Sequence, residues 1–125
     1  MATSDRIEIG RRGEELAARY LAAHGFRILQ RRFRTRSGEI DLVAEEGETL
    51  AFIEVKTRSS AACGSPAEAV DRRKQVRLTR AAEVYLARTG RYDAACRFDV
   101  VEVWDEPGGD GRIDHIRDAF RAGRA

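Results

Sequence analysis

Two charged side chains interrupt a stretch of sequence that is otherwise typical of a buried strand. The segment Phe52–Lys56 is apolar except for Glu54 and Lys56, as though a strand covered on both faces carried two charges. Because side chains alternate along a strand, Glu54 and Lys56 share one face and lie roughly 6 to 7 Å apart along it. An exposed ion pair contributes only about 0.2–1 kcal/mol, whereas removing an ion from water costs several kcal/mol. These two charges therefore need a partner or a function.

Asp41 joins these charges if the preceding segment folds back as a hairpin. The runs Glu39–Ala44 and Leu50–Thr57 are rich in β-forming residues and flank a glycine-containing turn. If that turn centres between residues 47 and 48, Asp41 faces Glu54, and a slip by two residues keeps Asp41 on the same face. Only an odd slip separates the two carboxylates, and it also reverses the apolar pattern. The hairpin thus predicts two acids and one ammonium on one small surface.

This combination favours a divalent-cation site. Two adjacent carboxylates repel each other, and one lysine cannot neutralise both. Magnesium takes oxygen ligands, usually one or two carboxylates with waters and substrate phosphate, and Asp41 and Glu54 supply such ligands. Glu14 is a third candidate acid, because its helical spacing with Ala17 and Leu21 places it on the face turned toward the sheet. Glu15 points elsewhere and serves as a solvent-facing control.

The elements that must position these residues follow the order α-β-β-β-α-β with a terminal strand, which predicts a mixed sheet flanked by helices. Small polar residues indicate a loop over 59–64, and a Gly-rich turn is expected over 107–111. The other expected elements are a helix over 5–24, a strand within 26–33, a helix from Ser65–Pro66 to Gly90 with an interruption at Asp71 left open, a strand over 98–104 and a short strand over 112–116.

Length and composition restrict the class of protein. With 125 residues, 42% hydrophobic and 35% charged, the chain is expected to form a single domain over residues 1–125. Its apolar runs are too short for a membrane span and no apolar signal follows Met1, so a cytoplasmic protein is expected. Cys63 and Cys96 lack metal-ligand spacing and are expected to be reduced thiols. No phosphate-binding glycine loop, zinc pattern or nucleophile elbow is present, which argues against ATP use and acyl chemistry.

Basic residues are clustered although the net charge is only +2. Five arginines fall within 27–36, and five basic residues fall within 72–80. Each cluster has two interpretations that the sequence leaves open: contact with nucleic-acid phosphates, or an ordinary solvated surface. Only two of the 23 basic residues are lysine, Lys56 and Lys74, and a lysine in such an arginine-rich chain hints at a task that arginine performs less well.

Four blocks of the sequence resemble the YraN-like family of uncharacterised bacterial proteins. The blocks are Gly13–Glu14, Gly38–Ala44, Phe52–Arg58 and Arg97–Val101. That family is similar in turn to archaeal Holliday-junction resolvases, and both belong to the restriction-endonuclease-like group with a PD-(D/E)xK nuclease site. The resemblance extends over most of the chain and implies a restriction-endonuclease-like fold with an α-β-β-β-α-β core. Ile40 stands where the name of the motif has proline.

The resemblance also implies a function and a set of roles. It implies an endonuclease that depends on Mg²⁺ or Mn²⁺ and hydrolyses DNA, branched or junction DNA included. By that resemblance Asp41 and Glu54 hold the metal and the Val55 carbonyl is a further ligand. Lys56 orients or activates the attacking water, and Glu14 completes the acidic cluster. Contacts with nucleic acid are expected from the basic residues near these blocks, namely Arg34, Arg36, Arg58, Arg73, Lys74 and Arg77.

Other functions stay open from the sequence. One alternative is a nucleic-acid-binding adaptor that keeps the nuclease scaffold but cuts poorly or not at all, because a fold does not determine a function. Another is a partner-binding domain without affinity for nucleic acid. A junction resolvase makes two symmetric cuts, so that substrate would imply a homodimer.

Overall fold

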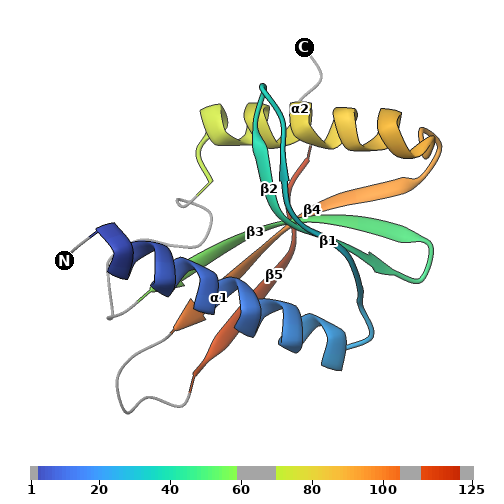
Figure 1. Ribbon diagram of the computed structural model, residues 1–125. Helices are drawn as coiled ribbons and strands as arrows, with labels where there is room; N and C mark the ends of the chain where they lie inside the picture. The colour runs from blue at the N-terminus through green and yellow to red at the C-terminus, as the bar shows by residue number, and fades with distance from the viewer. Residues whose placement is uncertain (1–2, 59–69, 105–110, 122–125) are drawn as a thin grey trace.

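A five-stranded mixed sheet lies between two helices in the computed structural model, which describes residues 3–58, 70–104 and 111–121 (Figure 1). The expected loop over 59–64 with Cys63, the helix start at Ser65–Pro66 and the turn preceding Gly111 lie outside the described residues. Neither described helix has the length and apolar character that crossing a membrane would require. Cys96 is an exposed free thiol.

The order of elements confirms the predicted fold class. The final strand continues to Phe120, whereas the sequence predicted a strand over 112–116, because Ala119 and Phe120 pack against the apolar core. Asp71 does interrupt the helical pattern: its side chain accepts a hydrogen bond from the Lys74 N–H at 2.9 Å and caps the second helix. The elements are α1 (Thr3–Ala23), β1 (Arg27–Arg34), β2 (Glu39–Glu46), β3 (Thr49–Arg58), α2 (Arg72–Thr89), β4 (Ala95–Trp104) and β5 (Ile113–Phe120).

The strands lie in their sequence order, and only β3 and β4 are parallel. Parallel neighbours need a crossover connection, and α2 lies within it on one face of the sheet. The core beneath α2 includes Val43, Phe52 and Leu78, whereas the core beneath α1 includes Leu21 and Ile53. Both faces of β3 are therefore covered, which accounts for its almost continuous apolar sequence.

The register of the β2–β3 hairpin is one of those that the sequence left open, the one in which Asp41 faces Glu54. Glu46 pairs with Thr49 and Leu42 pairs with Ile53, so the turn centres between residues 47 and 48. Continuing the register by one residue sets Asp41 opposite Glu54. Val43 and Phe52, the next pair on the same face, belong to the α2 core. The two acids thus lie where that core reaches the end of the paired strands.

Two glycines permit close contacts next to these acids. A Cβ atom at Gly38, which precedes β2, would lie 2.3 Å from the backbone oxygen of Arg77 in α2. A Cβ atom at Gly13 in α1 would lie 1.9 Å from Thr57 Oγ1 in β3. Real Cβ atoms do not approach other heavy atoms so closely, so only glycine allows these elements to pack as they do. The glycines bring α2 toward Asp41 and α1 toward β3.

Replacing Gly38 with alanine is expected to lower the free energy of unfolding by about 1–3 kcal/mol, because the new methyl group meets backbone that cannot turn aside. Urea denaturation monitored by circular dichroism measures the change. Gly10→Ala is the matched control, since a Cβ atom there would meet no other element of the described chain within 4 Å, and it is expected to stabilise helix α1 by about 0.5–1 kcal/mol. Equal effects of the two substitutions would contradict the close contact.

Candidate functional site

The site begins where the backbone ladder between β2 and β3 ends. The last ladder pair is Leu42 with Ile53, and beyond it the Val55 N–H donates to Asp41 Oδ2 at 2.8 Å. In an extended strand the N–H and C=O of one residue point to the same edge, so the Val55 carbonyl also faces the side on which Asp41 lies. A carboxylate and a backbone carbonyl oxygen are thereby brought to one position on the sheet edge.

Asp41 and Glu54 form a carboxyl pair in which Glu54 is buried and Asp41 is partly buried. The Glu54 side chain is 10% exposed, and both residues line a cavity of about 220 Å³. Burial, and then the charge of Glu54, raise the pKa of Asp41 to about 8, although the hydrogen bond from the Val55 N–H opposes the shift. Without a cation, Asp41 therefore keeps its proton at neutral pH. A divalent cation can replace that proton and remove the repulsion between the two acids.

Lys74 is the direct partner of Glu54. Its Nζ forms an ion pair with Glu54 Oε1, and it reaches the cavity from the first turn of α2. The sequence placed Lys74 among the nucleic-acid contacts and did not connect it with Glu54, which lies 20 positions earlier. Its identity as one of only two lysines was the available signal. Glu39, which also lines the cavity and raises the pKa of Asp41, was not singled out from the sequence.

Glu14 lies near the carboxyl pair but is held by an arginine. Arg32 Nε and Nη2 donate to the two Glu14 carboxylate oxygens, each at 3.2 Å. The charges of Glu14 and Glu39 add to the rise in the pKa of Asp41, and the predicted part of Glu14 in the acidic cluster stays a prediction. Hydrogen bonding and the charge of Glu14 raise the pKa of Arg32, with smaller contributions from Glu39 and Asp41. Arg32 adopts φ +52°, an uncommon conformation for a residue other than glycine.

Glu15 behaves as the predicted control. It lies on the exposed side of α1 and pairs with Arg19 and Arg31 instead of facing the cavity. These two arginines, Arg31 first, lower the pKa of Glu15. Adjacent acids on one helix thus have different environments, which makes Glu15 a suitable comparison for any substitution at Glu14 or Asp41.

Lys56 follows Glu54 on the same strand face, but its side chain extends into solvent. It is exposed, and none of the ion pairs among the described residues includes it. Because strand alternation turns Lys56 and Glu54 to the same side, the Lys56 ammonium is accessible to a ligand that approaches the carboxyl pair. Its predicted role toward water stays a prediction.

Arg58 corrects one expectation from the sequence. The sequence predicted a nucleic-acid contact, but the Arg58 side chain is only 8% exposed and its Nε lies 2.9 Å from Glu102 Oε2. Its guanidinium group also lies over the Trp104 ring, 5.8 Å from the centroid. The end of β3 packs against β4, and this packing encloses Arg58. It is therefore a structural ion pair and not an available phosphate contact.

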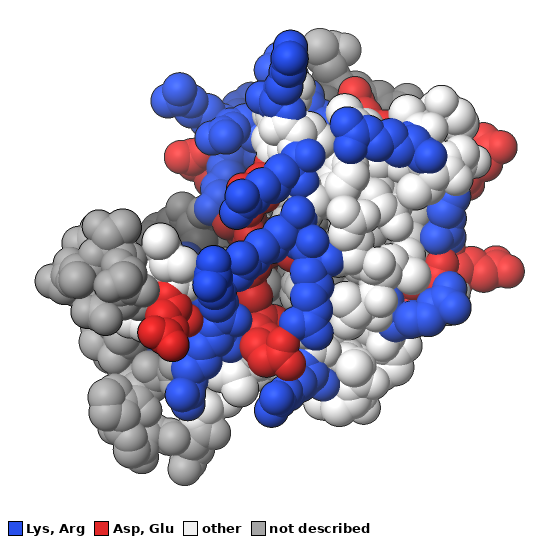
Figure 2. All heavy atoms as spheres, in the orientation of Figure 1, with Lys and Arg blue, Asp and Glu red and all other residues white. Residues whose placement is uncertain are grey.

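The other predicted nucleic-acid contacts lie on exposed surface. Figure 2 shows basic side chains gathered on one face of the molecule, with acidic side chains between them. Arg77 lines the same cavity as the carboxyl pair, and Arg34 pairs with Glu39 at 3.4 Å while keeping most of its surface exposed. Arg36 and Arg73 are exposed as well. We refer to these four arginines as the basic margin of the site.

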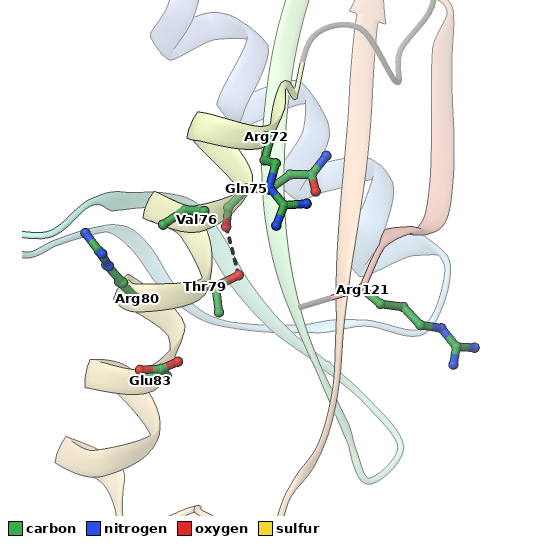
Figure 3. Close-up of a pocket in the computed structure, with 7 residues that line it drawn as sticks. All are labelled: Arg72, Gln75, Val76, Thr79, Arg80, Glu83 and Arg121. Carbon is green, nitrogen blue, oxygen red and sulfur yellow. Dashed lines mark hydrogen bonds between the residues drawn. The ribbon is translucent and has the colours of Figure 1, made fainter. Parts of the chain in front are cut away.

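A second cavity, of about 210 Å³, lies against α2. The α2 residues that line it differ from those that line the cavity of the carboxyl pair. Its basic residues are Arg72, Arg80 and Arg121. Figure 3 shows that these three guanidinium groups point in different directions instead of converging on one point. The Thr79 hydroxyl, which lines this cavity, already donates to the Gln75 carbonyl at 2.8 Å. This cavity lacks the convergent polar groups typical of a ligand site.

The fourth sequence block supports the sheet instead of the cavity. Asp99 is buried in β4 and accepts hydrogen bonds from Arg97, from the Asp118 N–H and from a His115 ring nitrogen at 2.8 Å. Burial opposes ionisation, but the bonds from His115 and Arg97 outweigh it and lower the pKa of Asp99. This network joins β4 to β5.

The donor set suits a hard divalent cation. Within residues 3–58, 70–104 and 111–121, no group of three or more His, Cys, Asp and Glu side chains is arranged to hold a metal ion as it stands. Two of the nearby acids are in ion pairs, Glu14 with Arg32 and Glu54 with Lys74. The oxygens at this position, those of the Asp41 and Glu54 carboxylates and the Val55 carbonyl, are of the kind that Mg²⁺ and Mn²⁺ prefer.

Comparison with known sequences gives a consistent family match. Residues 13–103 match the family model described as "Uncharacterised protein family UPF0102". A UPF0102 protein of Symbiobacterium thermophilum is 53% identical over 116 residues, covering 91% of this chain and 97% of its own. A UPF0102 protein of Rhodococcus jostii is 47% identical, with the same coverage of both chains. A UPF0102 protein of Chlorobium phaeobacteroides is 44% identical over 125 residues, covering 96% of this chain and 98% of its own.

Proposed function

Because the chain belongs to the uncharacterised protein family UPF0102, we propose its function from the site itself: a nuclease that depends on Mg²⁺ or Mn²⁺ and hydrolyses DNA phosphodiester bonds. The observation that carries the proposal is the pair of facing carboxyls, partly buried Asp41 and buried Glu54, beside the Val55 carbonyl. Such a pair is unfavourable unless a proton or a cation separates its charges. The surrounding basic residues favour a polyanionic substrate.

Each residue of the site has a role in this proposal. Asp41 and Glu54 hold the cation, and the Val55 N–H fixes the orientation of the Asp41 carboxylate. When bound, the cation makes water a better nucleophile and offsets negative charge on the phosphate. Lys56, exposed on the same face, orients the attacking water and adds a positive charge near the scissile phosphate.

The basic margin binds the rest of the substrate. Arginine forks match phosphate oxygens, and contacts with phosphates position a nucleic acid without reading its sequence. Arg77 and Lys74 line the cavity, so they contact phosphates close to the scissile bond. Arg34, Arg36 and Arg73 are farther contacts on exposed surface. DNA is the proposed partner, and a junction substrate would require a homodimer to place two sites on symmetric strands.

The direct test is cleavage by the purified protein. Junction, flap, linear and single-stranded DNA are incubated with Mg²⁺, with Mn²⁺ or with EDTA, alongside Lys56→Ala as a negative control. We expect metal-dependent cleavage of at least one substrate and its loss in the variant. Cleavage that is unchanged by EDTA and by Lys56→Ala would contradict the proposal, because it would come from a contaminant or from different chemistry.

One observation favours a second function, a nucleic-acid-binding adaptor with little or no turnover. Arg32 forms an ion pair with Glu14, and Lys74 forms an ion pair with Glu54. A scaffold that no longer binds metal would neutralise its acids in the same way. Fluorescence anisotropy of labelled DNA across a salt series separates the two functions. Tight, steeply salt-dependent binding without cleavage of any substrate supports the adaptor. Absence of DNA binding in every condition contradicts both.

Adding Mn²⁺ is expected to raise the melting temperature, because a ligand that binds only the folded protein stabilises it. At a free concentration of 100 times Kd the free energy of unfolding rises by about 2.7 kcal/mol. Differential scanning fluorimetry with and without EDTA measures the shift. Glu54→Gln should lose it, whereas Glu15→Gln, which changes an acid outside the cavity, should keep it. Equal shifts in both variants would place the metal elsewhere.

A further inference from the structure

We propose that Lys74 occupies the metal-binding carboxylate as a displaceable placeholder: a divalent cation takes Glu54 from Lys74, and the released ammonium then binds substrate phosphate. This inference rests on the proposed function, because it concerns the same site. It follows from the Lys74–Glu54 ion pair, which places a monovalent cation on one of the oxygens that the proposed metal needs.

The two ends of Lys74 differ in their freedom. Its backbone is held, because its N–H donates to the Asp71 cap, and one turn later Arg77 is in close contact with Gly38. Its side chain is 44% exposed and has four rotatable bonds in its stem, so it can leave Glu54 without any movement of α2. Displacement therefore needs only a change of rotamer.

Electrostatics make Lys74 and the metal alternatives at this position. The Glu54 side chain is 10% exposed, so some cation must accompany its charge. Lys74 does so in the metal-free protein. A divalent ion between Asp41 and Glu54 would neutralise both carboxylates, whereas a single lysine neutralises only one. The ion would also repel the nearby Lys74 ammonium.

The neighbouring acid shows why this position suits a lysine. Arg32 grips both oxygens of Glu14 through two nitrogens, whereas Lys74 contacts one oxygen of Glu54 through one nitrogen. A guanidinium fork resists replacement more than a compact ammonium does. Glu54 is thus the acid that is easily released, and Glu14 is the acid that stays paired. In a chain with two lysines among 23 basic residues, the one at Glu54 is a lysine.

Isothermal titration of Mn²⁺ into the metal-free protein, without DNA, tests the displacement. Lys74→Met should bind Mn²⁺ about 5- to 10-fold more tightly than the wild type, and Lys74→Arg should bind it more weakly. Arg77→Met is the matched control, because Arg77 lines the same cavity but is in none of the ion pairs of the described residues. It removes the same charge from the same helix and should change the affinity less than twofold.

The outcomes separate this inference from the nuclease proposal. Equal Mn²⁺ affinity in the wild type and Lys74→Met, or an equal gain in Arg77→Met, overturns the displacement and leaves the metal site intact. Absence of Mn²⁺ uptake by every variant overturns the displacement and the metal-dependent nuclease together. Mn²⁺ binding by Lys74→Met that is much tighter than binding by the wild type supports the displacement.

A second measurement avoids substitution of Lys74. With ¹⁵N-lysine labelling the wild type has only two side-chain ammonium signals to assign, those of Lys56 and Lys74. Adding Mg²⁺ should shift the Lys74 signal, and the shift should be absent in Glu54→Gln. An unchanged Lys74 signal in protein that calorimetry shows to be loaded with metal overturns the displacement.

The role of the released ammonium has its own readout. Without metal, Lys74 is engaged by Glu54, so Lys74→Met should leave the salt dependence of DNA binding unchanged in EDTA. With Mn²⁺ present, the slope of log affinity against log salt should fall by about one, the change expected for one lost phosphate contact. An equal slope for wild type and variant in Mn²⁺ would overturn the phosphate-binding step.

Discussion

Asp41→Asn is expected to abolish DNA cleavage and, at the same time, to stabilise the metal-free protein. The asparagine carbonyl keeps the acceptor for the Val55 N–H, so the local structure is retained. The substitution removes the negative charge that the cation needs, and the expected loss in turnover is on the order of 10³-fold or more. A purely structural aspartate would lose stability on this substitution and not gain it.

The stability effect has a defined pH dependence. Burial, and then the charge of Glu54, raise the pKa of Asp41 from its usual 3.8 to about 8. Between about pH 4 and pH 8 the unfolded chain releases a proton that the folded chain keeps, so the stability of the wild type falls as pH rises. Asparagine does not titrate. Its advantage should therefore grow across this window to about 2 kcal/mol or more at pH 8.

Urea denaturation in EDTA at several pH values measures this advantage, and the cleavage assay measures the loss of activity on the same preparations. Glu15→Gln is the control, because its carboxylate pairs with exposed arginines outside the cavity. It should leave cleavage unchanged. If Asp41→Asn is less stable than the wild type at pH 8, the folded structure does not disfavour the ionised form of Asp41, contrary to the raised pKa.

Lys56→Ala is expected to slow cleavage by roughly 10²–10³-fold while DNA affinity stays within about twofold. A well-placed donor supplies about 3–4 kcal/mol of transition-state stabilisation, and its removal gives a loss of this size. Because Lys56 is exposed, its removal should change the free energy of unfolding by less than about 0.5 kcal/mol. Single-turnover kinetics at saturating enzyme separate the chemical step from binding.

Lys74→Met is the informative comparison for this rate. Lys74, and not Lys56, contacts Glu54 in the metal-free protein. If Lys74→Met slows the chemical step more than Lys56→Ala does, the two lysines have exchanged the roles that the sequence suggests. A loss confined to DNA affinity in Lys74→Met agrees with a phosphate contact.

Local patterns were enough to predict the carboxyl pair. Strand alternation has a period of two, so the placement of Asp41 and Glu54 on one face followed from spacing, whereas the register that sets them opposite each other was left open. The order of elements followed from the same periodicities. The length of β5 did not, because its last residues are held by core packing and not by their own β-propensity.

Contacts between distant segments could not be predicted in this way. Spacing along the chain does not say which basic residue reaches which acid, because that depends on how closely helices and strands pack. Gly13 and Gly38 set those distances by removing a side chain at each contact. The sequence therefore determined the fold class and the shared face of the two acids through local geometry, whereas tertiary packing alone decided three pairings: Lys74 with Glu54, Arg32 with Glu14, and Arg58 with Glu102 away from solvent.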